Sequence, residues 1–181
     1  MADPIRVLVV DDIPETRDHL TKLLGFESDI DVVGSAASGR EALEMAVRLH
    51  PDVVLMDINM PDMDGIAATE QLSLAVPAAA VVMMSVQGEA DYLRRSMLAG
   101  AREFLVKPFS SDELTASIRQ VSARERDKQS RMALAPATTS GGSGKIGQAR
   151  VIEAHRDLGR EILELVAGQP QFREDHQIGA L

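Results

Sequence analysis

Residues 51–65 read PDVVLMDINMPDMDG, an apolar run that ends on a carboxylate and passes directly into a turn. A short run rich in β-branched residues and bounded by turn residues predicts a buried strand. Asp57 ends this run, and an acid at the carboxyl end of a parallel strand lies where open α/β sheets bind ligands. Asp57 is therefore a candidate functional residue, and a turn-capping Asp is the competing interpretation.

Four further apolar runs alternate with helical patterns on either side of this stretch. The predicted strands cover residues 5–10, 30–35, 53–56, 79–84 and 103–106. The predicted helices cover about residues 15–24, 39–49, 65–75, 89–98 and 111–121. Ser38 and Ser110 each precede a Glu by three residues, which is the pattern of a helix-capping box. Gly100 is expected to stop the fourth helix.

This alternation predicts the fold class. Strands that alternate with helices of this length form βαβ units and a parallel sheet. The runs are continuously apolar, as in strands that helices cover on both faces. We therefore expect an α/β fold, a doubly wound (βα)5 domain over residues 4–125.

The remainder of the chain differs in composition. Residues 126–148 are polar at first and then rich in Gly, Ser, Thr, Ala and Pro, which predicts a flexible linker. Residues 149–168 predict an amphipathic helix, and residues 169–181 a polar tail. The helix has a heptad-like apolar seam, which leaves open a homodimer or packing on the first domain. Its positions are Val151, His155, Leu158, Ile162 and Leu165.

Composition and charge limit the classes of function. The 181 residues are 45% hydrophobic and include no cysteine, so we expect no disulfide and no thiolate zinc site. The amino terminus lacks the order of a signal peptide. The longest apolar stretch, residues 74–84, is shorter than the roughly 20 residues that span a bilayer. We expect a cytoplasmic protein with no membrane partner. The net charge of −9, without a concentrated basic region, also argues against nucleic-acid binding.

Polar residues stand at four predicted strand ends: Asp11 and Asp12, then Asp57, Ser85 and Lys107. Adjacent carboxylates repel each other, and a divalent cation such as Mg²⁺ removes that cost. Asp57 could be a metal ligand only, or a nucleophile that attacks a phosphoryl group. Ser85 and Lys107 suit phosphoryl oxygens.

Each residue alone has an ordinary structural interpretation, as a loop acid, turn residue or surface lysine. Together they predict a phosphoryl-transfer pocket. The bond from Lys107 to the following proline is a candidate cis peptide.

With these residues in place, residues 4–125 resemble a receiver domain of the response regulators of two-component signalling, which has the flavodoxin-like strand order 2-1-3-4-5. The resemblance implies that Asp57 is the phosphoacceptor, with Lys107 and Ser85 as its catalytic partners. It implies a Mg²⁺ site that comprises the acidic pair, Asp57 and the backbone carbonyl of Asn59. It also implies that Phe104 is the aromatic switch residue, with ordinary strand packing as the alternative.

The resemblance further implies the partners. A sensor histidine kinase or phosphotransfer protein would supply the phosphoryl group. A downstream protein would bind the face formed by the fourth helix, fifth strand and fifth helix. Residues 84–100 are also similar to receivers joined to MinD-like ATPases of pilus assembly, although no ATPase domain follows in this sequence. The region around His155 resembles a histidine phosphotransfer helix, and a histidine on an amphipathic seam is the competing interpretation.

Two functions remain in view. The first is a phosphorylation-dependent switch that signals by protein contact and is not a turnover enzyme. The related metal-dependent phosphatases carry a second catalytic Asp two residues after the nucleophile, and Asn59 stands there instead. In the family, Asn59 and Gln87 would tune dephosphorylation. The alternative is a transcriptional response regulator with a missing or rudimentary DNA-binding effector.

Overall fold

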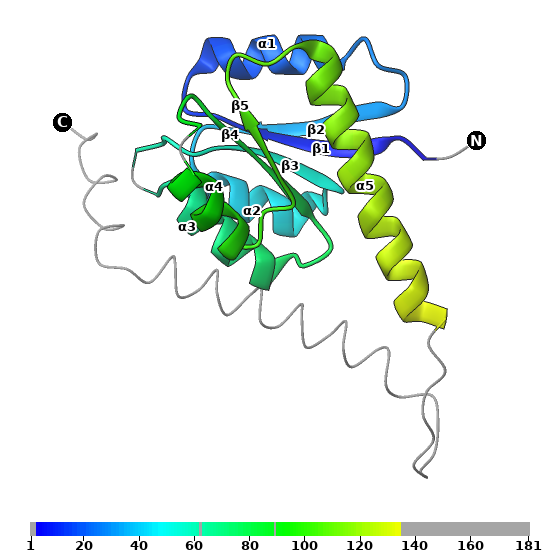
Figure 1. The fold of residues 1–181 in the computed structure, drawn as a ribbon. Coiled ribbons are helices and arrows are strands. Elements are labelled where there is room, and N and C mark those ends of the chain that lie inside the picture. The colour runs from blue at the N-terminus through cyan, green and yellow to red at the C-terminus, as the bar shows by residue number, and fades with distance from the viewer. Residues whose placement is uncertain (1–2, 62, 89, 135–181) are drawn as a thin grey trace, which may run out of the picture. The chain divides into compact units, whose positions relative to one another are not determined.

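The fold is that of a computed structural model, which describes residues 3–61, 63–88 and 90–134. Strands and helices alternate along these residues (Figure 1). In chain order the elements are β1 (Ile5–Val10), α1 (Pro14–Leu24), β2 (Ile30–Ala36), α2 (Gly39–Leu49), β3 (Val53–Asp57), α3 (Gly65–Ala75), β4 (Ala80–Ser85), α4 (Ala90–Leu98), β5 (Glu103–Val106) and α5 (Ser111–Leu134).

The strands form one parallel sheet in the order β2-β1-β3-β4-β5. This order confirms the predicted flavodoxin-like, doubly wound topology. The register brings the carboxyl ends of the central strands level. Val10 pairs with Met56, Asp57 pairs with Met84, and Ser85 pairs with Val106. The residues that end or follow these strands therefore meet at one edge of the sheet.

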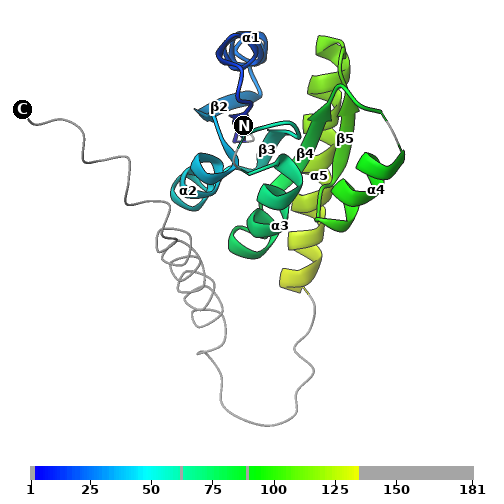
Figure 2. The ribbon, with the colours of Figure 1, turned by 90° about the vertical axis from the view of Figure 1, so that its left-hand side faces the viewer.

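Helices cover both faces of the sheet, so the central strands lie between two apolar layers. Helices α1 and α5 lie on one face and α2, α3 and α4 on the other (Figure 2). On the first face, Leu24 of α1 and Ile118 of α5 pack into the core, and on the second face Leu72 of α3 does so. Val7 through Val10 of β1 are fully buried. A strand buried on both faces explains why its sequence is continuously apolar.

The predicted helix boundaries have local causes. The Ser38 side chain accepts a hydrogen bond from the Glu41 backbone N–H at 3.2 Å, and α2 begins there. The Ser110 hydroxyl accepts from the Glu113 N–H at 3.2 Å, and the Glu113 carboxylate accepts from the Ser110 N–H at 2.7 Å. Both serines are confirmed as N-caps, and the full box forms at Ser110, whereas the Glu41 carboxylate accepts from the Ala37 N–H at 2.7 Å. After α4, Gly100 adopts φ 106°, a left-handed conformation that favours glycine.

One predicted boundary is wrong. The linker was expected to begin at residue 126, but α5 continues to Leu134. Residues 126–134 contain no Gly or Pro, and most of them are good helix formers. The ion pair between Arg102 and Glu125, 2.7 Å, further ties this end of the helix to the body. A polar composition was therefore not sufficient to distinguish a linker from an exposed helix.

The later segments lie outside the described residues. They are the rest of the predicted linker, the amphipathic helix at 149–168 with His155, and the polar tail at 169–181. Among the helices that the structure describes, none is long and apolar enough to cross a membrane.

Candidate functional site

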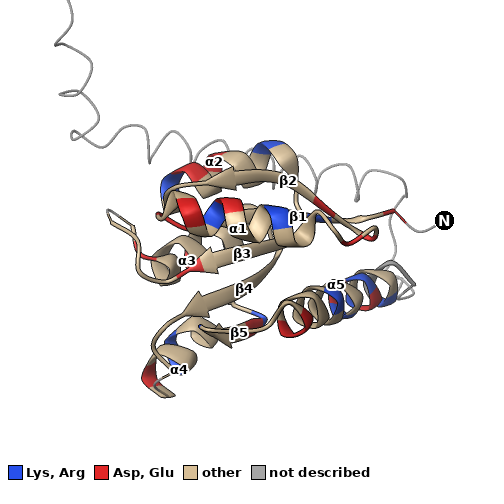
Figure 3. Cartoon of the chain, turned by 90° about the horizontal axis from the view of Figure 1, so that it is seen from above, with Lys and Arg blue, Asp and Glu red and all other residues tan. Residues whose placement is uncertain are grey.

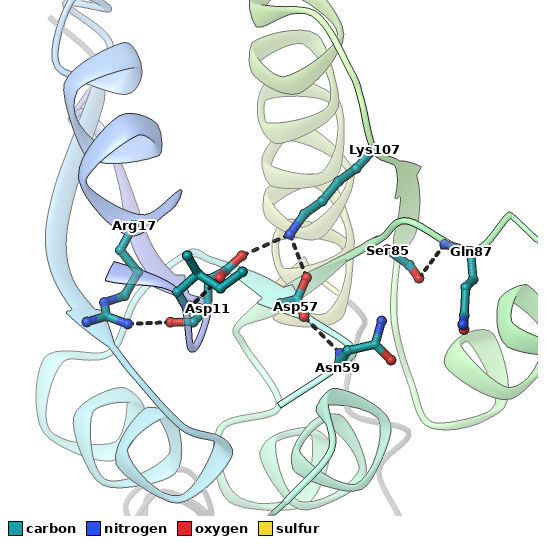
Figure 4. A network of polar contacts seen from close by, with 8 residues as sticks. Asp11, Arg17, Asp57, Asn59, Ser85, Gln87 and Lys107 are labelled. Carbon is teal, nitrogen blue, oxygen red and sulfur yellow. Dashed lines mark hydrogen bonds and ion pairs between the residues drawn. The ribbon is translucent and has the colours of Figure 1, made fainter. Parts of the chain in front are cut away.

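The candidate site lies at the edge where the central strands end. Asp11 follows β1, Asp57 ends β3, Ser85 ends β4 and Lys107 follows β5. Because β1, β3, β4 and β5 are neighbours and parallel, these four side chains come from consecutive strand ends. Figure 4 shows Asp11, Asp57 and Lys107 directed toward one another.

Lys107 joins the two buried carboxylates. Its Nζ lies 2.6 Å from Asp57 Oδ1 and 2.8 Å from Asp11 Oδ2 (Figure 4). The Asp11 and Asp57 side chains are almost fully buried, and the ammonium is about one-fifth exposed, at 21%. Buried charges of this kind need partners. One ammonium between two carboxylates leaves the group with surplus negative charge, which favours the approach of a further cation.

The pKa values reflect this crowding. Burial raises the pKa of Asp57 above its ordinary value, against the lowering effect of the Lys107 hydrogen bond and charge. The nearby Asp11 carboxylate also raises it. Burial alone would lower the pKa of Lys107, but its contacts with Asp11 and Asp57 outweigh burial and raise it. The lysine is therefore a permanent positive charge at neutral pH.

The loop after β3 holds Asp57 from the other side. Asp57 Oδ2 accepts a hydrogen bond from the Asn59 backbone N–H at 2.8 Å. The Gly65 N–H bonds to the Ile58 carbonyl at 2.9 Å and draws the start of α3 against this loop. A Cβ at Gly65 would collide with the carbonyl oxygen of Asp57. The glycine is required by this close approach.

Asp11 is held at four atoms. Its N–H donates to the Ala36 carbonyl at 3.2 Å, and its Oδ2 contacts Lys107. Its Oδ1 accepts from the Ile13 N–H at 3.0 Å, and its carbonyl accepts from Arg17 Nη1 at 2.6 Å (Figure 4). Arg17 was not among the residues predicted from sequence, and no spacing rule signals a side chain that reaches back to a loop carbonyl.

The structure does not bring the whole predicted metal set together. Within residues 3–61, 63–88 and 90–134, no three Asp, Glu, His or Cys side chains are close enough to hold a metal ion. Asp12 follows Asp11 in the same loop and is half-buried, and its part in a metal site stays a prediction. Asn59 donates its N–H to Asp57, and the role of its carbonyl at a metal stays a prediction.

Two carboxylates are nevertheless a sufficient protein contribution for Mg²⁺. This ion takes oxygen ligands, keeps several waters, and is usually bound through one or two carboxylates and a phosphate. Asp11 and Asp57 lie within contact distance of the same ammonium, and both are oxygen donors in a group with surplus negative charge. The donor set therefore fits Mg²⁺.

Ser85 and Phe104 lie beside this group on β4 and β5. The Ser85 hydroxyl is fully buried and accepts a hydrogen bond from the Gln87 N–H at 3.0 Å. The Ser85 carbonyl accepts from the Lys107 N–H at 2.7 Å, which joins the ends of the two strands. Phe104 pairs with Met83 across these strands and is half-buried against the core on the α2–α4 side. The bond from Lys107 to Pro108 is cis, as predicted.

Comparisons with known proteins agree with this geometry. A family model described as the response regulator receiver domain matches residues 7–119. The response regulator protein VraR of Staphylococcus saprophyticus is 40% identical over 117 residues, which are 65% of this chain and 56% of VraR. The chain thus spans little more than half the length of such relatives.

Two solved structures of receiver proteins are similar to this chain. The receiver domain of the response regulator NarL from Mycobacterium tuberculosis is 29% identical, with a TM-score of 0.64 over 67% of this chain and 98% of that one. A CheX–CheY–BeF3–Mg²⁺ complex from Borrelia burgdorferi is 30% identical, with a TM-score of 0.62 over 66% and 90%.

The comparisons do not support the expectation that nucleic acid is absent among the partners. One similar structure is that of a DNA-binding response regulator of the LuxR family from Staphylococcus aureus. It is 19% identical, with a TM-score of 0.62 over 65% of this chain and 98% of that one, so its likeness concerns the fold alone. The expectation stays a prediction that rests on charge.

Proposed function

The chain belongs to the response regulator receiver domain family, and from that premise we propose that it is a switch phosphorylated on Asp57 by a histidine kinase or phosphotransfer protein. The observation that carries the proposal is the bridge from Lys107 to Asp57 at 2.6 Å and to Asp11 at 2.8 Å. The bridge supports the proposal because the transfer needs a carboxylate, a fixed cation and a second acid close together.

The reaction is a transfer between two protein side chains. A carboxylate oxygen of Asp57 attacks the phosphorus of a phosphohistidine, and a P–O bond forms while the P–N bond breaks. The histidine nitrogen leaves with the bonding electron pair and takes up a proton. Asp57 is held by Lys107 on one oxygen and by the Asn59 N–H on the other, so its orientation is set before the donor arrives.

Lys107 and Ser85 act on the transferred oxygens. Charge on the phosphoryl oxygens is stabilised best by groups whose positions are fixed in advance. Lys107 supplies a positive charge at that place, and the buried Ser85 hydroxyl can donate a hydrogen bond. Asp11 and Asp57 would hold Mg²⁺, with Asp12 beside them in the same loop, and Mg²⁺ when bound neutralises part of the phosphoryl charge.

Phosphorylation would change the output face. We propose that Ser85 turns toward the phosphoryl group and that Phe104 occupies the space it leaves. The face of α4, β5 and α5 would then change shape, as a two-state element biased by a new charge. This face already exposes large apolar side chains on α4 and β5 and between β4 and α4, which suits a protein partner. They are Val86, Leu93, Met97 and Val106.

The site favours a switch over a turnover enzyme. Asn59 stands where the related phosphatases place a second catalytic acid, and an amide cannot exchange a proton as a carboxylate does. Its side chain is exposed, so it is positioned to affect the attack of water on the phosphoryl group. A cytoplasmic location, where a kinase and its nucleotide are available, accompanies this proposal.

The test is phosphorylation by a small donor. Wild-type protein incubated with acetyl phosphate and Mg²⁺ should gain the mass of one phosphoryl group, and the gain should disappear without Mg²⁺. Asp57→Asn should gain none. Persistent labelling of the Asn variant would overturn the assignment of the acceptor.

The alternative is a transcriptional regulator, and the length of the relatives favours it. The match covers 56% of VraR, so VraR contains a further region that this chain does not match. The net charge of −9 acts against binding to a phosphate backbone. A gel-shift assay with phosphorylated protein decides between the two, because salt-sensitive, sequence-specific binding would favour the regulator.

A further inference from the structure

Arg17 makes an unusual connection at the start of α1. Its side chain reaches back along the chain, and Nη1 donates to the Asp11 carbonyl at 2.6 Å. Its own backbone N–H bonds to the Ile13 carbonyl at 3.2 Å, and its carbonyl accepts from the Thr21 hydroxyl at 2.8 Å. The backbone of Arg17 is therefore fixed in α1, and its guanidinium is attached to the loop of Asp11 and Asp12 (Figure 4).

The loop of Asp11 and Asp12 leads into a helix that has no side-chain cap. Helix α1 begins at Pro14, and its N-cap residue Ile13 has no side chain that can accept a capping hydrogen bond. The usual restraint on the entry to a helix is thus missing. In its place, the Ile13 N–H bonds to the Asp11 carboxylate and Arg17 binds the Asp11 carbonyl. Loop and helix are joined through Asp11.

The carbonyl that Arg17 binds belongs to the peptide unit between Asp11 and Asp12. Because a peptide unit is planar and rigid, fixing its oxygen restricts ψ of Asp11 and φ of Asp12 together. The direction in which Cβ of Asp12 leaves the backbone therefore depends on the same contact. Lys107 and the Ile13 N–H meanwhile fix the Asp11 carboxylate.

We propose that Arg17 is a positioning residue for the Mg²⁺ site, and that it acts by orienting the peptide that carries the two adjacent acids. The inference rests on the proposed function. Groups that orient metal ligands without touching the metal typically contribute about 10–100-fold to metal affinity. Arg17 touches neither Asp57 nor the attacking oxygen, so its effect falls on Mg²⁺ binding and not on the phosphoryl-transfer step.

A purely electrostatic role for Arg17 would change the Mg²⁺ affinity in the opposite direction. A guanidinium close to a cation site repels the cation, so its removal would tighten Mg²⁺ binding if charge alone mattered. Positioning predicts the reverse, a weaker site without Arg17. The sign of the change in affinity therefore distinguishes the two roles.

The experiment is a calorimetric titration with Mg²⁺ in the absence of any phosphodonor. Arg17→Met, which keeps the apolar stem and removes the donor, should raise the Mg²⁺ dissociation constant by about tenfold. Arg17→Lys, which can still donate to a carbonyl, should recover much of the loss. With acetyl phosphate, the Met variant should need more Mg²⁺ for half-maximal labelling yet approach the wild-type rate at saturating Mg²⁺.

Lys22→Met is the matched control. It removes a cationic side chain from the exposed side of the same helix, so its Mg²⁺ affinity should equal that of wild type. If Arg17→Met does not fold, Arg17→Gln replaces it, with the same direction of change expected. An unchanged or tighter Mg²⁺ affinity in the folded variant overturns the inference. Failure of wild type to bind Mg²⁺ or to be labelled would instead count against the proposed function.

Discussion

The bridge made by Lys107 gives a quantitative prediction about stability. Replacing Lys107 with methionine keeps most of the apolar stem but leaves Asp11 and Asp57 facing each other without their shared cation. Breaking a fully buried pair by removing one partner costs about 3–5 kcal/mol. Water reaches the one-fifth of the lysine that is exposed, so we expect about 2–3 kcal/mol at pH 7.

That loss should appear in thermal unfolding without Mg²⁺. A domain of this size should lose about 8–12 °C in Tm for such a change. Lys22→Met is the matched control, because Lys22 is exposed on α1 and surface substitutions usually alter stability by at most about 0.5 kcal/mol. Added Mg²⁺ should restore part of the loss in the Lys107 variant, since a cation can again separate the two carboxylates.

The pH dependence has a definite sign. Burial already raises the pKa of Asp57, and Lys107 opposes the rise, so Lys107→Met should raise it further. A carboxyl with a raised folded-state pKa loses its destabilising charge as pH falls through that pKa. The deficit of the variant should therefore shrink as the pH is lowered from 7 toward 3.8, the ordinary pKa of an Asp carboxyl. A variant as stable as wild type at pH 7, or a deficit that grows on acidification, would refute this reasoning.

Three further predictions concern the surrounding fold. Arg119→Met should destabilise the protein at pH 7, because Arg119 lowers the pKa of Asp29. Above pH 3.8 the ionised Asp29 contributes stability, and this contribution is lost as the pH falls through its lowered folded-state pKa. The free energies of unfolding of variant and wild type, measured by urea titration, should therefore converge in acid. Gly65→Ala should disturb the loop at Asp57, and amide NMR shifts should change around Asp57; unchanged shifts would contradict the predicted collision. Ser38→Ala removes a helix cap, so urea unfolding should show a loss of about 1 kcal/mol, and a loss near zero would show the cap to be dispensable.

The strands and their order were predictable because each carries a strong local signal. The run from Val53 to Met56 is continuously apolar, and all of it is buried between two helical layers. The polar residues at the strand ends were conspicuous because they interrupt apolar runs. A parallel sheet then brings such residues to one edge without further information. This is why Asp11, Asp57, Ser85 and Lys107 were found from the sequence.

Other features depend on contacts that sequence spacing does not encode. The path of Arg17 back to the Asp11 carbonyl is a long-side-chain contact with no periodic pattern. Asp12 adjoins Asp11 and is half-buried, but adjacency in sequence does not determine whether two side chains reach the same ion, so its part in the metal site stays a prediction. The end of α5 does not follow from the sequence pattern, because exposed polar residues form helices and linkers alike and residues 126–131, all exposed, show no apolar face that would mark a helix.

The central claim is that Asp57 itself accepts the phosphoryl group. Borohydride reduces an aspartyl phosphate to homoserine, so the modified position can be read directly by peptide mass spectrometry. After incubation with acetyl phosphate and Mg²⁺, homoserine should stand at position 57, and it should be absent when the phosphodonor is omitted. Homoserine at Asp11 or Asp12 instead, or at none of the three positions, would contradict the account.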